Sequence, residues 1–376
     1  MRPNRFPLPA WGAAIYAAIR GLSLAVAAFL LPRGHIARLH YSLWHLIVSW
    51  DSGRYTKIAA HGYSYIPGNL RHDSLYAWFP GYPGVIDALA WIPGLGYARA
   101  GLCVTIAAGL AAAWGLTRLG LTLTGDARVS LLLTALWAAA PASVVLSIVY
   151  PEALFCALAV WCLVALLERR WLTAGLLAAV AGTVHNTAMA LVAAIAVAAV
   201  PEVVRALRDG TSWWRPLVAV LLAPLGLLGY WGYAGLAMHR LDGWFWVEKN
   251  AHNGFDWGRS TADTLGDAVL HGCSKAVALT LLVVIAAVVL TGCVLVSRLP
   301  VFLKVYTAFV VITAIATGPY YFGSKPRFLL PAMLLALPLA RLLAPARTWL
   351  LVPLIAVLTA ATTWCALYLM SIGWAP

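Results

Sequence analysis

Segment 50–63 is a polar island in a strongly apolar chain. It carries one carboxylate, Asp51, followed by Arg54 and Lys57 and by two tyrosines, whereas the whole chain is 62% hydrophobic and only 10% charged. A carboxylate can take a proton from a hydroxyl group, and a cation about one helical turn away favours its ionised form. An Asp at this position is also typical of a helix N-cap, and the two roles are compatible.

Two further groups of polar residues adjoin apolar runs. Glu152 follows Tyr150-Pro151 at the start of one run, and Lys325 and Arg327 precede another. The chain has 13 acidic residues. Most of them fall in segments that the charge pattern places on the outer side of a membrane. Chemistry is therefore expected on the outer face, although long outer loops also carry more polar residues for structural reasons.

The elements that position these residues are predicted to be transmembrane helices. The mean hydropathy is +0.84, and apolar runs long enough to span a bilayer recur along the chain. The net charge of +13 comes largely from arginines between apolar runs, which indicates cytoplasmic loops rather than nucleic-acid binding. The six cysteines form no CxxC pair, so no zinc site or disulfide framework is indicated.

The charge pattern predicts an all-α polytopic membrane protein with about 11 transmembrane helices and a cytoplasmic N-terminus. Two large outer loops are expected, 32–96 and 239–275. The first should contain interfacial helices, including an amphipathic one at 35–49, and a stretch ending near Pro93 that does not cross. Arg20, inside the first span, should face the protein interior. Segment 171–200 is long for one span and should break at His185-Asn186.

The order of several motifs resembles the mannosyltransferases of the PIG-V type. These motifs are Trp50-Asp51 with Tyr55 and Gly62-Tyr63, then Phe79-Pro80 with Tyr82-Pro83, then Tyr150 with Glu152, then Trp257-Gly258-Arg259 and Lys325-Pro326-Arg327-Phe328. The resemblance covers roughly the whole chain, 1–376, as one domain. It implies the type C glycosyltransferase (GT-C) fold, an extracytoplasmic active site and a polyprenyl-phosphate mannose donor.

An inverting transfer needs one base for the acceptor hydroxyl, while the phosphate leaves as a stable anion. The resemblance makes Asp51 that base, with Arg327, Lys325 and Arg259 binding the donor phosphate. Glu152, Tyr55 and His61 would orient the acceptor or a metal. A divalent metal is possible, but no ligand spacing indicates one. The expected sugar or lipid contacts are Trp50, Tyr63, Tyr82, His185, Asn186 and Trp257.

A transporter or lipid flippase with ion-coupled outer acids is the alternative. Such a protein should carry ionisable residues near the midplane of several spans, where this chain has mainly Arg20, with His185 at a helix break. The enzyme hypothesis is therefore preferred. Its acceptor would be a glycan, glycolipid or protein, and the Ala-rich, Arg-over-Lys composition is typical of a bacterial gene, which suggests a bacterial plasma membrane.

Overall fold

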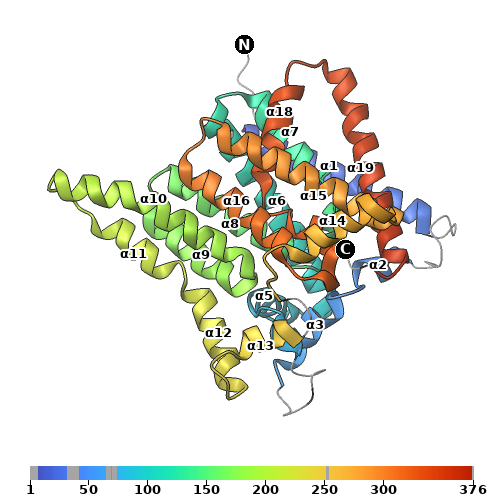
Figure 1. Ribbon diagram of the computed structural model, residues 1–376, viewed down its shortest axis with the longest axis horizontal. Coiled ribbons are helices and arrows are strands. Elements are labelled where there is room, and N and C mark those ends of the chain that lie inside the picture. The colour runs from blue at the N-terminus through green and yellow to red at the C-terminus, as the bar shows by residue number, and fades with distance from the viewer. Residues whose placement is uncertain (1–6, 32–41, 65–68, 70–73, 251–253, 375–376) are drawn as a thin grey trace.

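The protein is almost entirely helical in the computed structural model, which describes residues 7–31, 42–64, 69, 74–250 and 254–374 (Figure 1). Within these residues the only β-type pairing is an isolated bridge between Phe255 and Thr317. The predicted all-α class is confirmed. The longer helices are α1 (Leu8–Leu30), α6 (Gly96–Thr124), α7 (Ala127–Ala138), α8 (Glu152–Leu167), α9 (Trp171–Val184), α10 (Met189–Arg208), α12 (Leu225–Ala237), α14 (Arg259–His271), α15 (Lys275–Val296), α16 (Val301–Ala316) and α19 (Thr348–Ser371).

Shorter helices connect these elements in the described part of the chain, and five of the twelve lie within the two predicted outer loops. They are α2 (Leu43–Ile47), α3 (Ser52–His61), η2 (Ser74–Ala77), α5 (Gly81–Ala90), η3 (Ser143–Ser147), η4 (Asn186–Ala188), α11 (Trp214–Leu222), α13 (Gly243–Asn250), η5 (Pro319–Ser324), α17 (Lys325–Phe328), η6 (Met333–Leu335) and α18 (Ala336–Leu343).

Six helical segments among the described residues are long and apolar enough to cross a membrane, or seven if one bent pair, 322–328 with 333–343, forms a single span. Four shorter apolar helices, α7, α8, α9 and α16, fall below that length. The integral membrane class is thus supported. The predicted number of about 11 spans stays a prediction, because it requires all four shorter helices to cross as well.

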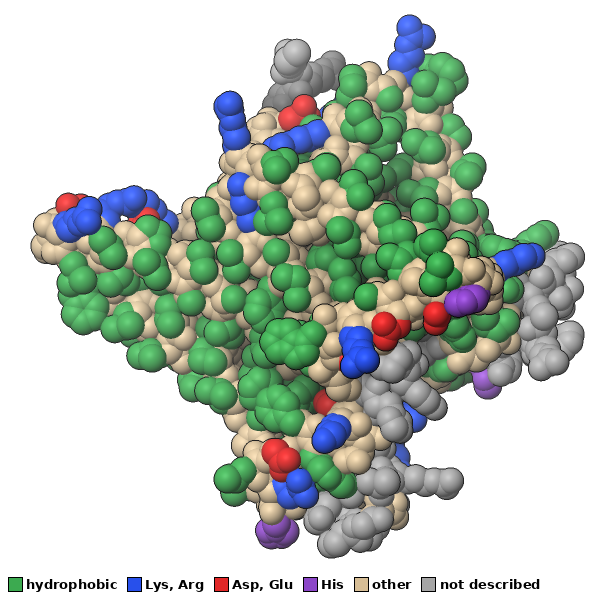
Figure 2. Space-filling view, in the orientation of Figure 1, with side chains coloured by type: hydrophobic (Ala, Val, Ile, Leu, Met, Phe, Trp, Pro, Cys, Tyr) green, Lys and Arg blue, Asp and Glu red, His purple; other side chains and the backbone are tan. Residues whose placement is uncertain are grey.

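The surface is consistent with a membrane environment. Figure 2 shows hydrophobic side chains over much of the visible face, whereas charged side chains gather at the tip between α10 and α11, along the upper margin and in the lower half. Lipid contact explains this pattern, since apolar surface of this extent is unusual in soluble monomers.

The predicted features of the first outer loop are present in part. Helix α5 has 10 residues and is not among the segments long enough to cross. Helix α2 occupies the end of the predicted amphipathic helix at 35–49, but residues 35–41 lie outside the described residues. The break in segment 171–200 is confirmed: α9 ends at Val184, His185 is extended (φ −156°, ψ 142°), and η4 begins at Asn186.

Helices α6, α8 and α9 form the centre of the molecule, and α1 packs on α6 and α7. Arg20 of α1 is buried, as expected, and its Nη1 donates a hydrogen bond to the carbonyl of Ser143. Tyr16, one turn earlier, donates to the carbonyl of Leu146. Together they pair carbonyls of η3, a non-α segment whose backbone needs such partners at membrane depth. Segment η3 leads directly to Tyr150 and Glu152.

Close helix packing holds α9 against α12 just before the break at His185. Gly226 of α12 lies against α9 so tightly that a Cβ atom there would be 1.8 Å from the carbonyl oxygen of Ala179. Gly182 of α9 faces the same helix, and its Cβ would be 2.8 Å from the backbone nitrogen of Leu227. The α9–α12 contact therefore requires small residues.

We predict that Gly226→Ala destabilises the protein by about 1–3 kcal/mol, because the added methyl overpacks the α9–α12 contact. Gly229→Ala is the matched control, since it lies on the same helix and a Cβ there meets nothing within 4 Å. Thermal unfolding in detergent measures both. Equal melting temperatures for the two variants would contradict the packing argument.

Candidate active site

Asp51 stands at the N-cap position of α3, but its side chain makes no capping hydrogen bond. Its carboxylate instead contacts two arginines through different oxygens. Arg54 Nη1 is 3.0 Å from Oδ1, and Arg327 Nη1 is 3.4 Å from Oδ2. The expected cation one turn away is confirmed as Arg54. The side chain of Asp51 is 19% exposed, so the carboxylate can still be reached from outside.

Arg327 joins this carboxylate to the second one. Its Nε lies 3.4 Å from Oε1 of Glu152, the first residue of α8, and both side chains are buried. The guanidinium also lies over two aromatic rings, 5.4 Å from the centroid of Tyr150 and 4.9 Å from that of Phe328. Three residues that the sequence analysis selected, Asp51, Glu152 and Arg327, thus form one cluster.

Tyr150 positions the cluster, although it was not among the predicted site residues. The backbone N–H of Asp51 donates to its hydroxyl oxygen at 3.1 Å, and Thr105 Oγ1 donates to its carbonyl at 3.3 Å. Tyr82 pairs with Thr105 at 2.8 Å and is completely buried. Tyr82 therefore supports the site from the core and is not placed for the predicted direct contact with sugar or lipid.

Tyr55 lies on α3 one turn after Asp51 and packs edge-on against the rings of Tyr82 and Tyr150. Burial, and then the nearby carboxylates of Glu152 and Asp51, raise the pKa of its phenol well above the usual value. Tyr55 stays neutral at physiological pH, so it can donate a hydrogen bond but cannot act as a base.

The break between α9 and α10 brings His185 to the same region. Its Nδ1 accepts a hydrogen bond from the backbone N–H of Thr187 at 3.1 Å, and its ring lies 5.4 Å from that of Phe155, on the first turn of α8. The amide oxygen of Asn186 is buried and has no hydrogen-bond partner among the described residues.

Lys325 lies in a different environment from the one expected for a phosphate-binding residue. Its ammonium donates to the carbonyls of Ala314, Ile315 and Thr317 at 3.3, 2.9 and 2.7 Å. These carbonyls belong to the C-terminal end of α16, whose last carbonyls have no partners within the helix. The side chain is fully buried. Lys325 therefore closes the end of α16 and orients the short helix that carries Arg327.

The motif Trp257-Gly258-Arg259 begins α14 in the second outer loop. The Arg259 side chain is exposed and faces Asp263 of its own helix, with 3.8 Å between Nε and Oδ2. Trp257 has a positive φ of 60° and is 88% exposed, beside Phe255. Asp256 accepts hydrogen bonds from the backbone N–H groups of Gly258 and Ser260. The structure does not bring Arg259 or Trp257 into contact with Asp51 or Arg327.

Three further predicted site residues lie on or next to α3: Trp50, His61 and Tyr63. Trp50 precedes Asp51 with φ 58° and is 36% exposed, so it borders the cluster. His61 ends α3 and is exposed, about 15 Å along the helix from Asp51. Tyr63 belongs to an aromatic group with Tyr76 and Tyr230.

Among the described residues no three His, Cys, Asp or Glu side chains are placed to hold a metal ion.

Arg54 links the cluster to this aromatic group, since its guanidinium lies 4.6 Å from the ring centroid of Trp78. The hydroxyls of Tyr63 and Tyr230 both donate to the carbonyl of Trp78. Trp78 was not predicted as a site residue. The sequence feature that could have identified Trp78 is its position directly before the Phe79-Pro80 motif.

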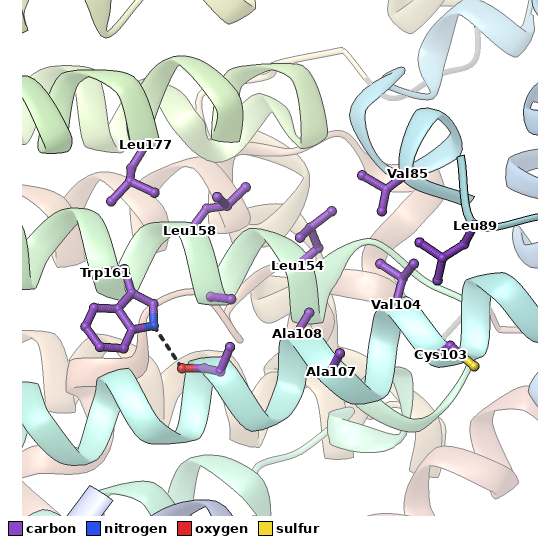
Figure 3. A pocket seen from close by; sticks show the side chains of 12 residues that line it. Val85, Leu89, Cys103, Val104, Ala107, Ala108, Leu154, Leu158, Trp161 and Leu177 are labelled. Carbon is purple, nitrogen blue, oxygen red and sulfur yellow. Dashed lines mark hydrogen bonds between the residues drawn. The ribbon is translucent and has the colours of Figure 1, made fainter. Parts of the chain in front are cut away.

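An apolar groove of about 450 Å³ lies between α5, α6, α8 and α9 (Figure 3). It begins at Leu154, two residues after Glu152, and follows α8 for about 10 Å to Trp161. The indole of Trp161 donates to the carbonyl of Ala111 at 3.1 Å. Its position also requires Gly115, because a Cβ there would be 3.1 Å from the indole nitrogen. Trp161 therefore forms a fixed end of the groove.

We predict that Lys325→Met destabilises the protein by about 1–3 kcal/mol, because three carbonyls at the end of α16 lose their charged donor. Lys275→Met, at an exposed lysine that starts α15, should change stability by less than about 0.5 kcal/mol. Thermal unfolding in detergent compares the two. Unchanged stability of Lys325→Met would contradict this structural role and leave Lys325 as a candidate phosphate ligand.

Comparison with known proteins is consistent with this geometry. No curated protein gives a significant sequence match. A similar solved structure is that of ArnT from Cupriavidus metallidurans bound to undecaprenyl phosphate, with 13% sequence identity, a TM-score of 0.57, and coverage of 95% of this chain and 77% of that one. This likeness supports the predicted GT-C fold. Residues 20–229 match the profile described as Mannosyltransferase (PIG-V), so the chain belongs to the PIG-V mannosyltransferase family.

Proposed function

We propose that this protein is an inverting mannosyltransferase that moves mannose from a polyprenyl-phosphate carrier to a hydroxyl group of an acceptor. The observation that carries the proposal is the contact of one buried arginine with two carboxylates, of which Asp51 remains accessible. Family membership supports glycosyl transfer in general. The carrier, the acceptor and the roles below are the proposal.

Asp51 is proposed as the general base. An acceptor hydroxyl beside the Asp51 carboxylate transfers its proton to that carboxylate as its oxygen attacks the anomeric carbon. The bond from that carbon to the phosphate oxygen breaks, and the electron pair leaves on the phosphate. A general base of this kind contributes about 10²–10⁴-fold to the rate. No acid is needed for the phosphate, since it leaves as a stable anion.

Arg327 is proposed to bind the phosphate, because a charged guanidinium N–H holds a phosphate oxygen strongly and stabilises the charge that develops there. Its Nη1 and Nε contact Asp51 and Glu152, which leaves Nη2 for the phosphate, and the rings of Tyr150 and Phe328 lie close to the guanidinium. Arg54, half-exposed and bonded to Asp51, is a further cation near the acceptor side.

The apolar groove is proposed to hold the first part of the polyprenyl chain. It starts beside Glu152, which contacts Arg327, so a phosphate on Arg327 would place its chain near the groove. The ArnT structure was determined bound to undecaprenyl phosphate, and a shared fold makes a related carrier reasonable here. The volume of the groove falls within the usual range for small-molecule sites.

The proposed setting is a bacterial plasma membrane with the N-terminus in the cytoplasm and the cluster at the outer face. The acceptor is a glycan, a glycolipid or a protein. A transporter is less well supported, because Asp51, Glu152 and Arg327 contact one another near the starts of helices and do not lie along a path through the spans.

We predict that Asp51→Asn lowers mannose transfer at least about 100-fold, because the amide cannot accept the proton. The assay measures transfer of radiolabelled mannose from polyprenyl-phosphate mannose to acceptors in membranes that contain the protein. Asp263→Asn, at an exposed aspartate of α14, is the matched control and should keep wild-type activity. Full activity of a folded Asp51→Asn protein would exclude Asp51 as the base.

We also predict that Ala107→Phe raises the KM for the polyprenyl donor about tenfold, because the new ring occupies the groove that the chain needs. Ile106→Phe is the control, since Ile106 is its neighbour on α6, is 49% exposed and does not line the groove. Identical KM values for the two variants would place the chain elsewhere.

A further inference from the structure

The two carboxylate oxygens of Glu152 differ, because only one of them contacts Arg327. Oε1 lies 3.4 Å from Arg327 Nε, whereas Oε2 is buried and has no hydrogen-bond partner among the described residues. The residue as a whole is only 4% exposed. A buried carboxylate oxygen without a donor is costly, so its persistence calls for a specific donor such as a ligand hydroxyl.

His185 provides the complementary group. Because its Nδ1 accepts the backbone N–H of Thr187, the neutral ring carries its proton on Nε2, which is then a hydrogen-bond donor. The ring packs against Phe155, which shares the first turn of α8 with Glu152. The next residue, Asn186, has a buried amide oxygen without a partner among the described residues.

The arrangement thus presents a donor and acceptors beside Arg327, on the side of Glu152. Asp51 contacts the same guanidinium through a different nitrogen, Nη1. If the phosphate sits on Arg327 and the acceptor hydroxyl approaches Asp51, the transferred sugar lies between them. Its ring hydroxyls can then reach Glu152 and His185. A sugar hydroxyl both donates and accepts, which matches this pair of groups.

We propose that Glu152 and His185, with Asn186, form the subsite that recognises the hydroxyl groups of the transferred sugar. This inference rests on the proposed function and assigns Glu152 to the donor sugar and not to the acceptor or to a metal. The three residues determine which sugar is accepted, whereas Arg327 binds any carrier phosphate.

The test compares binding of two probes to the detergent-solubilised full chain by calorimetry: farnesyl phosphate and farnesyl-phosphate mannose. The ratio of their dissociation constants isolates the contribution of the sugar and needs no acceptor. We expect the wild type to bind the mannosylated probe more tightly. We expect His185→Gln and Glu152→Gln to reduce that ratio about 10- to 100-fold, because a neutral amide replaces the charged acceptor at position 152 and a flexible amide replaces the fixed imidazole donor at position 185.

His271→Gln and Glu168→Gln are the matched controls. His271 is exposed at the end of α14, and Glu168 pairs with Arg118 on the predicted inner side. Both should keep the wild-type ratio. If Glu152→Gln also weakens binding of farnesyl phosphate, His185→Gln decides the question, since it leaves both ion pairs of Arg327 in place.

A wild-type ratio close to one, or a normal ratio in both site variants, would overturn the subsite while leaving the carrier phosphate site intact. Failure of the wild type to bind either probe would instead refute the proposed function itself. A probe with 2-deoxymannose adds detail, because a reduced preference for mannose over this analogue in the variants would identify the hydroxyl that is recognised.

Discussion

The buried guanidinium of Arg327 is the constraint on which the rest of the site depends. A charge removed from water is tolerated only when it is paired and hydrogen-bonded. Here Asp51 and Glu152 lie on two nitrogens of Arg327, and aromatic rings lie along its faces. Removing Arg327 would leave the buried carboxylate of Glu152 without its cation. The same pairing fixes the distance between the proposed base and the proposed phosphate site.

The chain must bring distant segments together to satisfy this pairing. Asp51 and Arg327 are 276 residues apart. The start of α3, the start of α8 and the short helix α17 converge, and each is held by a separate device. Tyr150 holds the backbone of Asp51, the contacts of Arg20 and Tyr16 with η3 lead the chain to Glu152, and Lys325 closes α16 beside Arg327. Each of these contacts is made with a backbone group and not with the carboxylates of Asp51 and Glu152.

The sequence was sufficient for the membrane class, the break at His185 and the three charged residues of the cluster. Rare charges next to apolar runs are conspicuous, so Asp51 and Glu152 could be selected from residue type and place, whereas Arg327 was selected through the resemblance to the PIG-V family. The structural roles of Tyr82 and Lys325 could not be predicted from the sequence. Burial of a tyrosine and capping of a distant helix by a lysine depend on tertiary contacts. His61 looked close to Asp51 in sequence, but α3 separates them by its own length.

The groove that ends at Trp161 has a consequence for how substrate reaches the protein. Because Trp161 closes it after about 10 Å, a long isoprenoid cannot continue inward past this side chain, and the rest of the chain must lie outside the groove, in the lipid. Loading and release of a carrier would then occur by lateral diffusion within one leaflet. The quantity that governs saturation is the mole fraction of carrier in the bilayer, so diluting the membrane with inert lipid would lower the rate even when the bulk concentration is constant.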